Sequence, residues 1–161
     1  MRKILRTCLI AISSIIFLHP VAAQRTCTLY WTDNELNVIS RSNADGTNIQ
    51  NIITNESSVV SVRVDAANGK LYWGRNNLKD IKRSNLDGTM EETIVANPNP
   101  TGLSVVADIQ LDVPNGKIYW SDRGLPRLSA PVIMRANLDG SNQETLITNE
   151  SALSIDLDLV Q

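Results

Sequence analysis

Short segments in which apolar and polar residues alternate run through the chain from about residue 28 onwards. In VVSVRVD, residues 59–65, valines at every second position are separated by Ser61, Arg63 and Asp65. This period of two, with many β-branched residues, predicts a strand. We find no convincing helical periodicity in residues 24–161. The pattern therefore predicts an all-β protein.

Two kinds of turn separate these segments. Asn68-Gly69 is a strong signal for a two-residue hairpin, because both residues tolerate positive φ. VPNGK, residues 113–117, repeats that turn. The second kind is the Asp-Gly pair at 45–46, 87–88 and 139–140. The alternation of the two turns predicts units of four short antiparallel strands.

The aromatic residues mark the same units. Every Tyr and Trp of the chain belongs to one of three doublets, Tyr30-Trp31, Tyr72-Trp73 and Tyr119-Trp120. Four-stranded sheets that repeat every 40–50 residues are typical of a β-propeller. Neighbouring strand residues point to opposite faces, and a blade has a neighbour on each face, so both rings of a doublet can be buried. We interpret the doublets as core between blades; the alternative is a platform on which a ligand stacks.

The first 23 residues have the pattern of a secretory signal peptide. MRKILR is basic, TCLIAISSIIFL is apolar, and VAA supplies a small-residue cleavage site. A short membrane anchor is the alternative, but the apolar stretch at residues 7–18 is too short to span a bilayer comfortably, and no later apolar run is long enough for a transmembrane helix. We therefore expect a signal peptide at 1–23, a half-propeller domain at 24–161, and a secreted or extracellular product, periplasmic or cell-surface if bacterial.

Removal of this segment changes the chemistry of the chain. It takes away Arg2, Lys3 and Arg6, which leaves 12 basic against 17 acidic residues, a net charge of −5. Such a charge disfavours nucleic acid as a partner. His19, the only histidine, is also lost, which excludes catalysis or metal binding by His. Cys27 remains as a single cysteine and cannot form an internal disulfide.

LYWTD, ADGT and VDAANGKLYW together resemble the YWTD repeat, the class B repeat of the low-density lipoprotein receptor family. Three copies cover residues 29–161. The resemblance implies a six-bladed propeller that acts as an extracellular protein-binding module, with Asp33 and Asp122 making structural hydrogen bonds between blades. The second copy departs from the motif, because YWGR places Arg75 at that position.

The chain has half the blades of such a ring. It begins on the second strand of a blade and ends with LSIDLDLVQ, where Asp158 matches Asp65 and Asp112 of earlier first strands. We expect twelve strands, equal to three four-stranded blades, with the last out of phase. Our preferred hypothesis is a homodimer in which each last strand completes the first blade of the other chain. Pairing with a separate half-propeller chain and a fragment of a longer protein are the alternatives.

Two insertions predict a partner-binding face. The spacing from Tyr-Trp to Asp-Gly is 15, 15 and 20 residues, and that from Asp-Gly to the next first-strand Asp is 20, 25 and 19. Both longer loops contain proline, and the topology places them side by side on one face; tolerated loop drift is the alternative. The nominated residues are Pro98, Asn99, Pro100, Arg123, Leu125, Pro126, Arg127 and Leu128.

Weaker signals complete the interpretation. Asn55 and Asn149 each begin an Asn-Glu-Ser sequence, a candidate glycosylation site. Lys79, Lys82 and Arg83 are interpreted as a solvated strand face. Asp65, Asp112 and Asp158 are the only candidates for a channel metal of a lactonase- or esterase-like enzyme; their recurrence in every unit favours a structural role. We therefore expect a non-enzymatic module for a protein or peptide ligand, without a cofactor; a propeller hydrolase or a non-functional fragment is the alternative.

Overall fold

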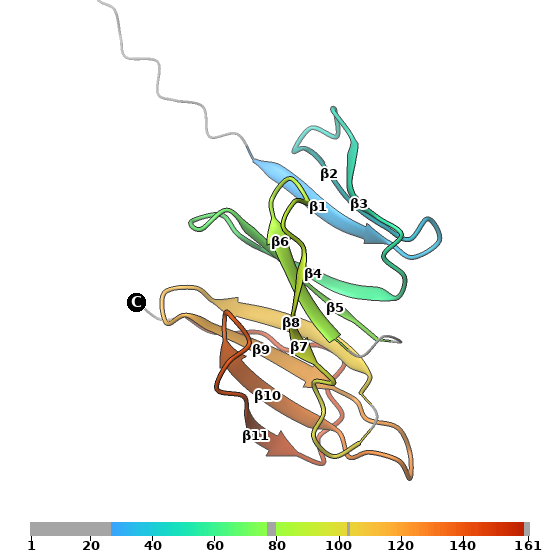
Figure 1. Ribbon diagram of the computed structural model, residues 1–161, viewed down its shortest axis with the longest axis vertical. Coiled ribbons are helices and arrows are strands. Elements are labelled where there is room, and N and C mark those ends of the chain that lie inside the picture. Colours follow the sequence, from blue (N-terminus) through green and yellow to red (C-terminus); the bar gives the residue numbers. More distant parts are fainter. Residues whose placement is uncertain (1–26, 77–79, 103, 160–161) are drawn as a thin grey trace, which may run out of the picture.

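The computed structural model describes residues 27–76, 80–102 and 104–159 (Figure 1). In these ranges the chain forms eleven strands in three antiparallel sheets and no helix, which confirms the all-β prediction. The signal peptide expected at 1–23 lies outside the described residues. Among those residues no helix is long and apolar enough to cross a membrane.

The first sheet has three strands, in the order β1-β2-β3. They are β1 (Thr28–Asp33), β2 (Val38–Asn43) and β3 (Gln50–Thr54). Within residues 27–76, 80–102 and 104–159, the Tyr30-Trp31 strand pairs with β2 alone, and its other edge has no partner. This is the result expected from a chain that enters its first blade on the second strand.

The next two sheets are complete four-stranded meanders, ordered β4-β5-β6-β7 and β8-β9-β10-β11. Their strands are β4 (Val59–Asp65), β5 (Lys70–Arg75), β6 (Asp80–Asn85), β7 (Glu92–Ala96), β8 (Val106–Asp112), β9 (Lys117–Asp122), β10 (Val132–Asn137) and β11 (Glu144–Thr148). The sheets follow one another along the long axis of the molecule (Figure 1). The innermost strand β4 contacts both β1 and β8, so the sheets stack as propeller blades do.

Both kinds of turn connect antiparallel strands, but the two-residue hairpin expected at Asn68-Gly69 is wrong, because four residues, 66–69, lie between the paired Asp65 and Lys70 and Asn68 does not have positive φ. Gly69 and Gly116 have φ of 65°, the region that favours glycine. Asp65 accepts hydrogen bonds from the backbone and side chain of Asn68, at 3.0 and 2.7 Å. In the second kind of turn, Asp87 accepts from the backbone N–H of Thr89 at 3.0 Å. Hydrogen bonds from Thr89 therefore hold the pKa of Asp87 below its ordinary value.

Two apolar cores lie between the sheets, and the central doublet belongs to both. Trp73 is fully buried in the core between the first two sheets, and Tyr72 in the core between the second and third. Close packing here also requires Gly74, since a Cβ at that position would lie 2.7 Å from Cγ1 of Val106. The opposite directions of neighbouring side chains thus let one doublet join three sheets.

The outer doublets only partly follow the expectation that both rings are buried. Trp120 is fully buried, but Tyr119 is half-buried because it lies on the open face of the third sheet. Tyr30 and Trp31 are both half-buried. Tyr30 packs against the first core, whereas Trp31 lies on the side without a neighbouring sheet.

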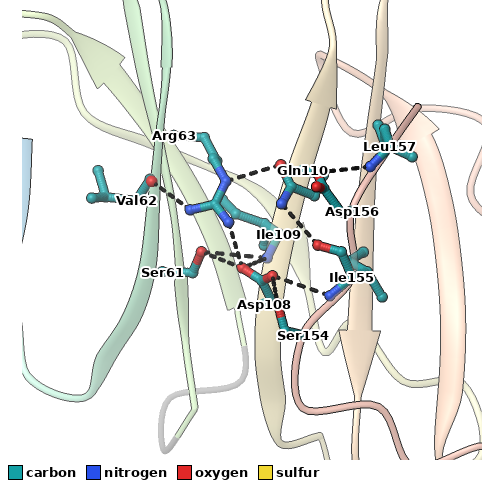
Figure 2. A network of polar contacts seen from close by, with 10 residues as sticks. All are labelled: Ser61, Val62, Arg63, Asp108, Ile109, Gln110, Ser154, Ile155, Asp156 and Leu157. Carbon is teal, nitrogen blue, oxygen red and sulfur yellow. Dashed lines mark hydrogen bonds and ion pairs between the residues drawn. The ribbon is translucent and has the colours of Figure 1, made fainter. Parts of the chain in front are cut away.

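The expected twelfth strand is not formed. Residues 154–159 have no ladder partner, since no described segment pairs with them, and a strand requires one. The segment nevertheless lies beside β8 (Figure 2). Ser154 and the backbone N–H of Ile155 donate to Asp108, at 2.9 and 3.2 Å, and Gln110 donates to the carbonyl of Ile155 at 2.8 Å. It therefore occupies the innermost position of a fourth blade as a single extended segment.

Asp108 joins three such innermost segments. On its other side it accepts from the hydroxyl of Ser61 at 2.7 Å and from Arg63 at 2.8 Å, both on β4 (Figure 2). Ser61, Asp108 and Ser154 are equivalent positions of successive units. The hydrogen-bonded row places the C-terminal segment in the same relation to β8 as β8 has to β4.

Two further contacts repeat at both junctions between sheets. Arg41 donates to the carbonyl of Leu86 at 3.1 Å, and the equivalent Arg83 donates to that of Leu138 at 3.0 Å. At the same junctions a Cβ on Gly88 or Gly140 would clash with a carbonyl of the preceding sheet, on Ile52 and Ile94 respectively. The Asp-Gly turns of the second and third sheets therefore pack directly against the sheet before them.

A buried ion-pair cluster joins the first and second sheets. Glu56 is 6 % exposed and bonds Lys82 at 2.7 Å, Arg75 at 3.0 Å and the indole of Trp73 at 3.3 Å. Burial lowers the pKa of Lys82, but hydrogen bonds with Glu56 and Glu91 outweigh it, so the pKa is raised. The interpretation of Lys82 as part of a solvated strand face is therefore wrong. Lys79 lies outside the described residues.

Candidate partner-binding face

The two inserted loops lie side by side, as their positions in the topology predict. One connects β7 to β8, and the other connects β9 to β10. Asn99 donates to the carbonyl of Ala130 at 2.9 Å, and the N–H of Ala130 donates to the hydroxyl of Thr101 at 2.9 Å. Because hydrogen bonds join them, the two loops form one surface.

Asp122, at the end of β9, fixes the base of this surface. Its carboxylate is fully buried and accepts from Nδ2 of Asn99 at 3.0 Å, from the N–H of Val105 at 2.8 Å, and from the N–H of Gly124 at 2.8 Å. The hydroxyl of Ser104 donates to it as well. The structural role that the family resemblance implies for Asp122 is thus observed. Asp33 differs, because it accepts from the N–H groups of Glu35 and Leu36 within its own turn.

Two of the nominated residues serve the scaffold. Asn99 is fully buried between the loops, so its nomination as a contact residue is wrong. Pro98 is also buried, and its carbonyl accepts from the indole of Trp120 at 2.8 Å. Both were expected at the surface because a proline-containing loop is usually exposed. Here the side chain of Asn99 and the carbonyl of Pro98 form hydrogen bonds with Asp122 and Trp120 of the third sheet instead.

A tight turn presents the tip of the second loop. The N–H of Leu128 donates to the carbonyl of Leu125 at 2.9 Å, with Pro126 and Arg127 between them. Proline at the second position and a positive φ of 66° at the third are features of a type II turn. Glycine normally fills the third position; Arg127 occupies it at a cost of about 1–2 kcal/mol in backbone strain.

The exposed part of this face is basic and apolar. Of the nominated residues, five are exposed and Leu125 is half-buried. The exposed residues are Pro100, Arg123, Pro126, Arg127 and Leu128. Leu128 is 62 % exposed and borders an open hollow with Thr101, Arg127 and Ala130. Two guanidinium groups beside exposed apolar side chains suit an extended partner segment that carries both carboxylates and apolar residues.

The candidate metal ligands do not converge. Asp65 and Asp112 each bind the Asn of their own hairpin, Asn68 and Asn115. Asp158 is exposed in the C-terminal segment. In the described ranges no group of three or more His, Cys, Asp or Glu side chains is placed to hold a metal ion.

Two sets of polar residues were not predicted from the sequence, the Asp108 row and the Glu56 cluster. An aspartate within the apolar strand VADIQLD was the available signal for the first. The second had none, since Glu56 and Lys82 are 26 residues apart. The candidate glycosylation sites Asn55 and Asn149 are both exposed, at φ of 63° and 66°, and their modification stays a prediction.

Comparison with known families identifies one repeat directly. Residues 116–158 match the model of the low-density lipoprotein receptor repeat class B. This range contains β9, β10 and β11, the third of the three units found in the sequence. A search of curated protein sequences finds no match.

Solved structures with the same arrangement of strands include an extracellular complex and two bacterial proteins. The structure of a nidogen/laminin complex matches 76 % of this chain and 44 % of its own, with 24 % identity and a TM-score of 0.65. A putative TolB from Agrobacterium tumefaciens matches 76 % and 45 % at 17 % identity and a TM-score of 0.55. The Niastella koreensis GH74 enzyme matches 73 % and 19 % at 15 % identity and a TM-score of 0.55.

The chain spans less than half the length of these structures, and the likeness establishes the fold alone. The likeness confirms that this chain is a partial β-propeller, and the match at residues 116–158 identifies one of its units as a low-density lipoprotein receptor class B, or YWTD, repeat.

Proposed function

We propose that this chain is a secreted, non-enzymatic interaction module that binds a protein or peptide through the face formed by its two inserted loops. The observation that carries the proposal is Arg127. It stands at the exposed tip of a tight turn, in a conformation that favours glycine, on loops anchored by the buried Asp122. Strained backbone is found at functional sites, but exposed Met90 also has a positive φ of 56°, so the proposal rests on the strain together with the buried anchor and the exposed apolar Leu128 beside it.

The comparisons support a protein ligand without naming it. The nidogen structure contains laminin as its partner, which is a precedent for protein binding by a similar fold. The Niastella koreensis structure is an enzyme, but at 15 % identity it supports the fold only. We propose no catalytic role, because Asp65 and Asp112 each bind their own turn and Asp158 is exposed in the C-terminal segment.

Three single variants test this face. Arg127→Gly and Leu128→Ser remove a charge and an apolar contact at the loop tip, and Met90→Ser removes an exposed apolar side chain from the opposite face. Met90 is 76 % exposed in the turn between β6 and β7, so it is a matched control. The tagged proteins are incubated with extracellular proteins from the source organism, and captured proteins are identified and then purified.

We expect a purified partner to bind wild type and Met90→Ser equally, and to bind Arg127→Gly and Leu128→Ser at least tenfold more weakly. Arg127→Gly should fold at least as stably as wild type, because glycine relieves the positive φ. A partner that binds all four proteins with equal affinity would rule out this face. Hydrolysis of lactones or esters by the purified chain would instead favour the enzyme alternative.

We also propose that the face works in a closed ring of six blades. A second half-propeller, either another copy or a separate chain, would then cover the two open sheet faces.

A further inference from the structure

We propose that the ring is closed by a second copy of the same chain, and that residues 153–158 of each copy form the missing first strand of the other copy's first sheet. The proposal goes beyond the ligand-binding function and rests on the fold. At one end of the described structure, the first sheet has no innermost strand. At the other end, residues 153–158 occupy an innermost position but have no sheet.

The first end lacks one strand. Among the described residues, the second and third sheets have an innermost strand beside the Tyr-Trp strand, whereas β1 has none. An open hollow runs along the inner side of the sheets, lined by β1, β4, β8 and the C-terminal segment, with Trp31, Arg63, Asp108 and Ser154 among its residues. An exposed strand edge with free N–H and carbonyl groups is a template for another strand.

The second end supplies one strand without a sheet. Residues 153–158 are held at the innermost position by Asp108 and Gln110, as described above. They lie extended, without a ladder partner in the described chain. Leu153 is 68 % exposed there. The segment has six residues, the length of β1.

The observed sheets predict the register of this pairing. Val62 is opposite Trp73 in the second sheet, and Ile109 is opposite Trp120 in the third. The equivalent residues place Ile155 of one copy opposite Trp31 of the other. By the same register Asp158 lies opposite Thr28, and Leu159 lies opposite Cys27.

The faces of the outer sheets match as well. Ile147 is 44 % exposed, although its equivalents Ile53 and Val95 are buried between sheets. On the opposite end, Leu29 is 54 % exposed, although its equivalents Leu71 and Ile118 are fully buried. Each end therefore exposes the apolar residues that the described junctions cover.

The polar contacts of a junction are also preserved. Arg135 is equivalent to Arg41 and Arg83, which donate to a carbonyl of the following sheet. Gly46, at φ of 80°, is equivalent to Gly88 and Gly140 but has no neighbouring atom within 4 Å of a Cβ. In the ring, Arg135 would reach the carbonyl of Ala44 in the second copy, and Gly46 would meet that copy's Leu146.

Charge favours a second copy as the occupant. Arg63 and Gln110 are equivalent positions on neighbouring innermost strands, and Arg63 donates to Gln110 at 3.1 Å. The next equivalent position is Asp156, which would face Arg63 of the second copy. An acidic and a basic residue thus meet at the new junction. Two copies would supply six sheets.

Cysteine cross-linking tests the register. In Leu159→Cys, the new thiol lies opposite Cys27 of the second copy, at a separation that a disulfide can span. In Leu153→Cys, the matched control, the new thiol lies about six residues away along the strand, roughly 20 Å.

We expect a disulfide-linked dimer of the secreted Leu159→Cys protein on non-reducing gels, and little linkage of the control. Mass spectrometry of the dimer should find a peptide in which Cys27 is joined to the thiol introduced at position 159. Equal linkage in both variants, or the same link formed within one chain, would overturn the proposal.

Light scattering and sedimentation give an independent measurement. Wild type should be a dimer, Ile147→Asp should be a folded monomer, and Met90→Asp should stay a dimer. Ile147 is exposed in the single chain, so its replacement leaves the sheet itself intact. A wild-type protein that is monomeric and folded at all concentrations would contradict the proposal. That result would not contradict the proposed ligand-binding face, because the Arg127 and Leu128 variants can be tested on the monomer.

Discussion

Asp122 shows how one buried carboxylate supports a whole binding surface. Its two oxygens accept hydrogen bonds from both inserted loops. No other described side chain binds both Asn99 and the N–H of Gly124. The conformation of the exposed residues above it therefore depends on an acceptor that no partner touches.

We predict that Asp122→Asn destabilises the fold by about 1–3 kcal/mol, since the amide nitrogen replaces an acceptor and leaves at least one buried donor unpaired. Asp33→Asn is the control. Asp33 accepts only from turn amides through one oxygen, which Asn retains, so a change within about 0.5 kcal/mol is expected. Urea unfolding of the two variants measures the difference. Equal losses would show that Asp122 has no special role.

At the scale of elements, the three Asp-Gly turns share a sequence but not an environment. Gly46, Gly88 and Gly140 have φ of 80°, 84° and 81°. A Cβ would meet nothing at Gly46, whereas it would clash with the backbone of the preceding sheet at the other two positions. Glycine at this turn position thus provides the positive φ in all three turns, and in the second and third turns it also allows close packing against the preceding sheet.

We predict that Gly46→Ala costs the single chain about 1–2 kcal/mol, the strain of a left-handed residue. Gly88→Ala and Gly140→Ala should cost more, because the sheets must also separate. Unfolding measured at a protein concentration low enough to give monomer compares the three variants. A loss for Gly46→Ala as large as for the other two would contradict the packing role.

Much of this arrangement could be predicted from local sequence. The Asn-Gly and Asp-Gly turns specify their hairpins, and the offsets between them placed the two inserted loops on one face. The prediction of a twelfth strand was wrong because a strand needs a ladder partner, which residues 154–159 lack in the described chain. The burial of Asn99 and Lys82 was missed because it depends on acceptors 23 and 26 residues distant.

At the scale of the whole molecule, the proposed dimer makes thermal stability depend on protein concentration. We predict that the midpoint of unfolding of wild type rises over a hundredfold increase in concentration. In Asp156→Arg the rise should be smaller or absent, because the new arginine would face Arg63 of the second copy. Glu35→Arg reverses another exposed charge, away from this strand, and should behave as wild type. Calorimetry or circular dichroism provides the midpoints, and a constant midpoint for wild type would count against the dimer.

The burial of the central Tyr72-Trp73 doublet predicts the sequence in which the sheets unfold. Both aromatic rings of β5 are buried, which is not the case for β1 or β9. The second sheet therefore packs against a sheet on each face, whereas the first and third sheets each pack against one. In a stack whose layers touch only their nearest neighbours, opening starts at the layers with one contact. A single chain is therefore expected to fray from its two ends inward, with amide protons of β5 the last to exchange and the middle meander the last piece to resist a protease.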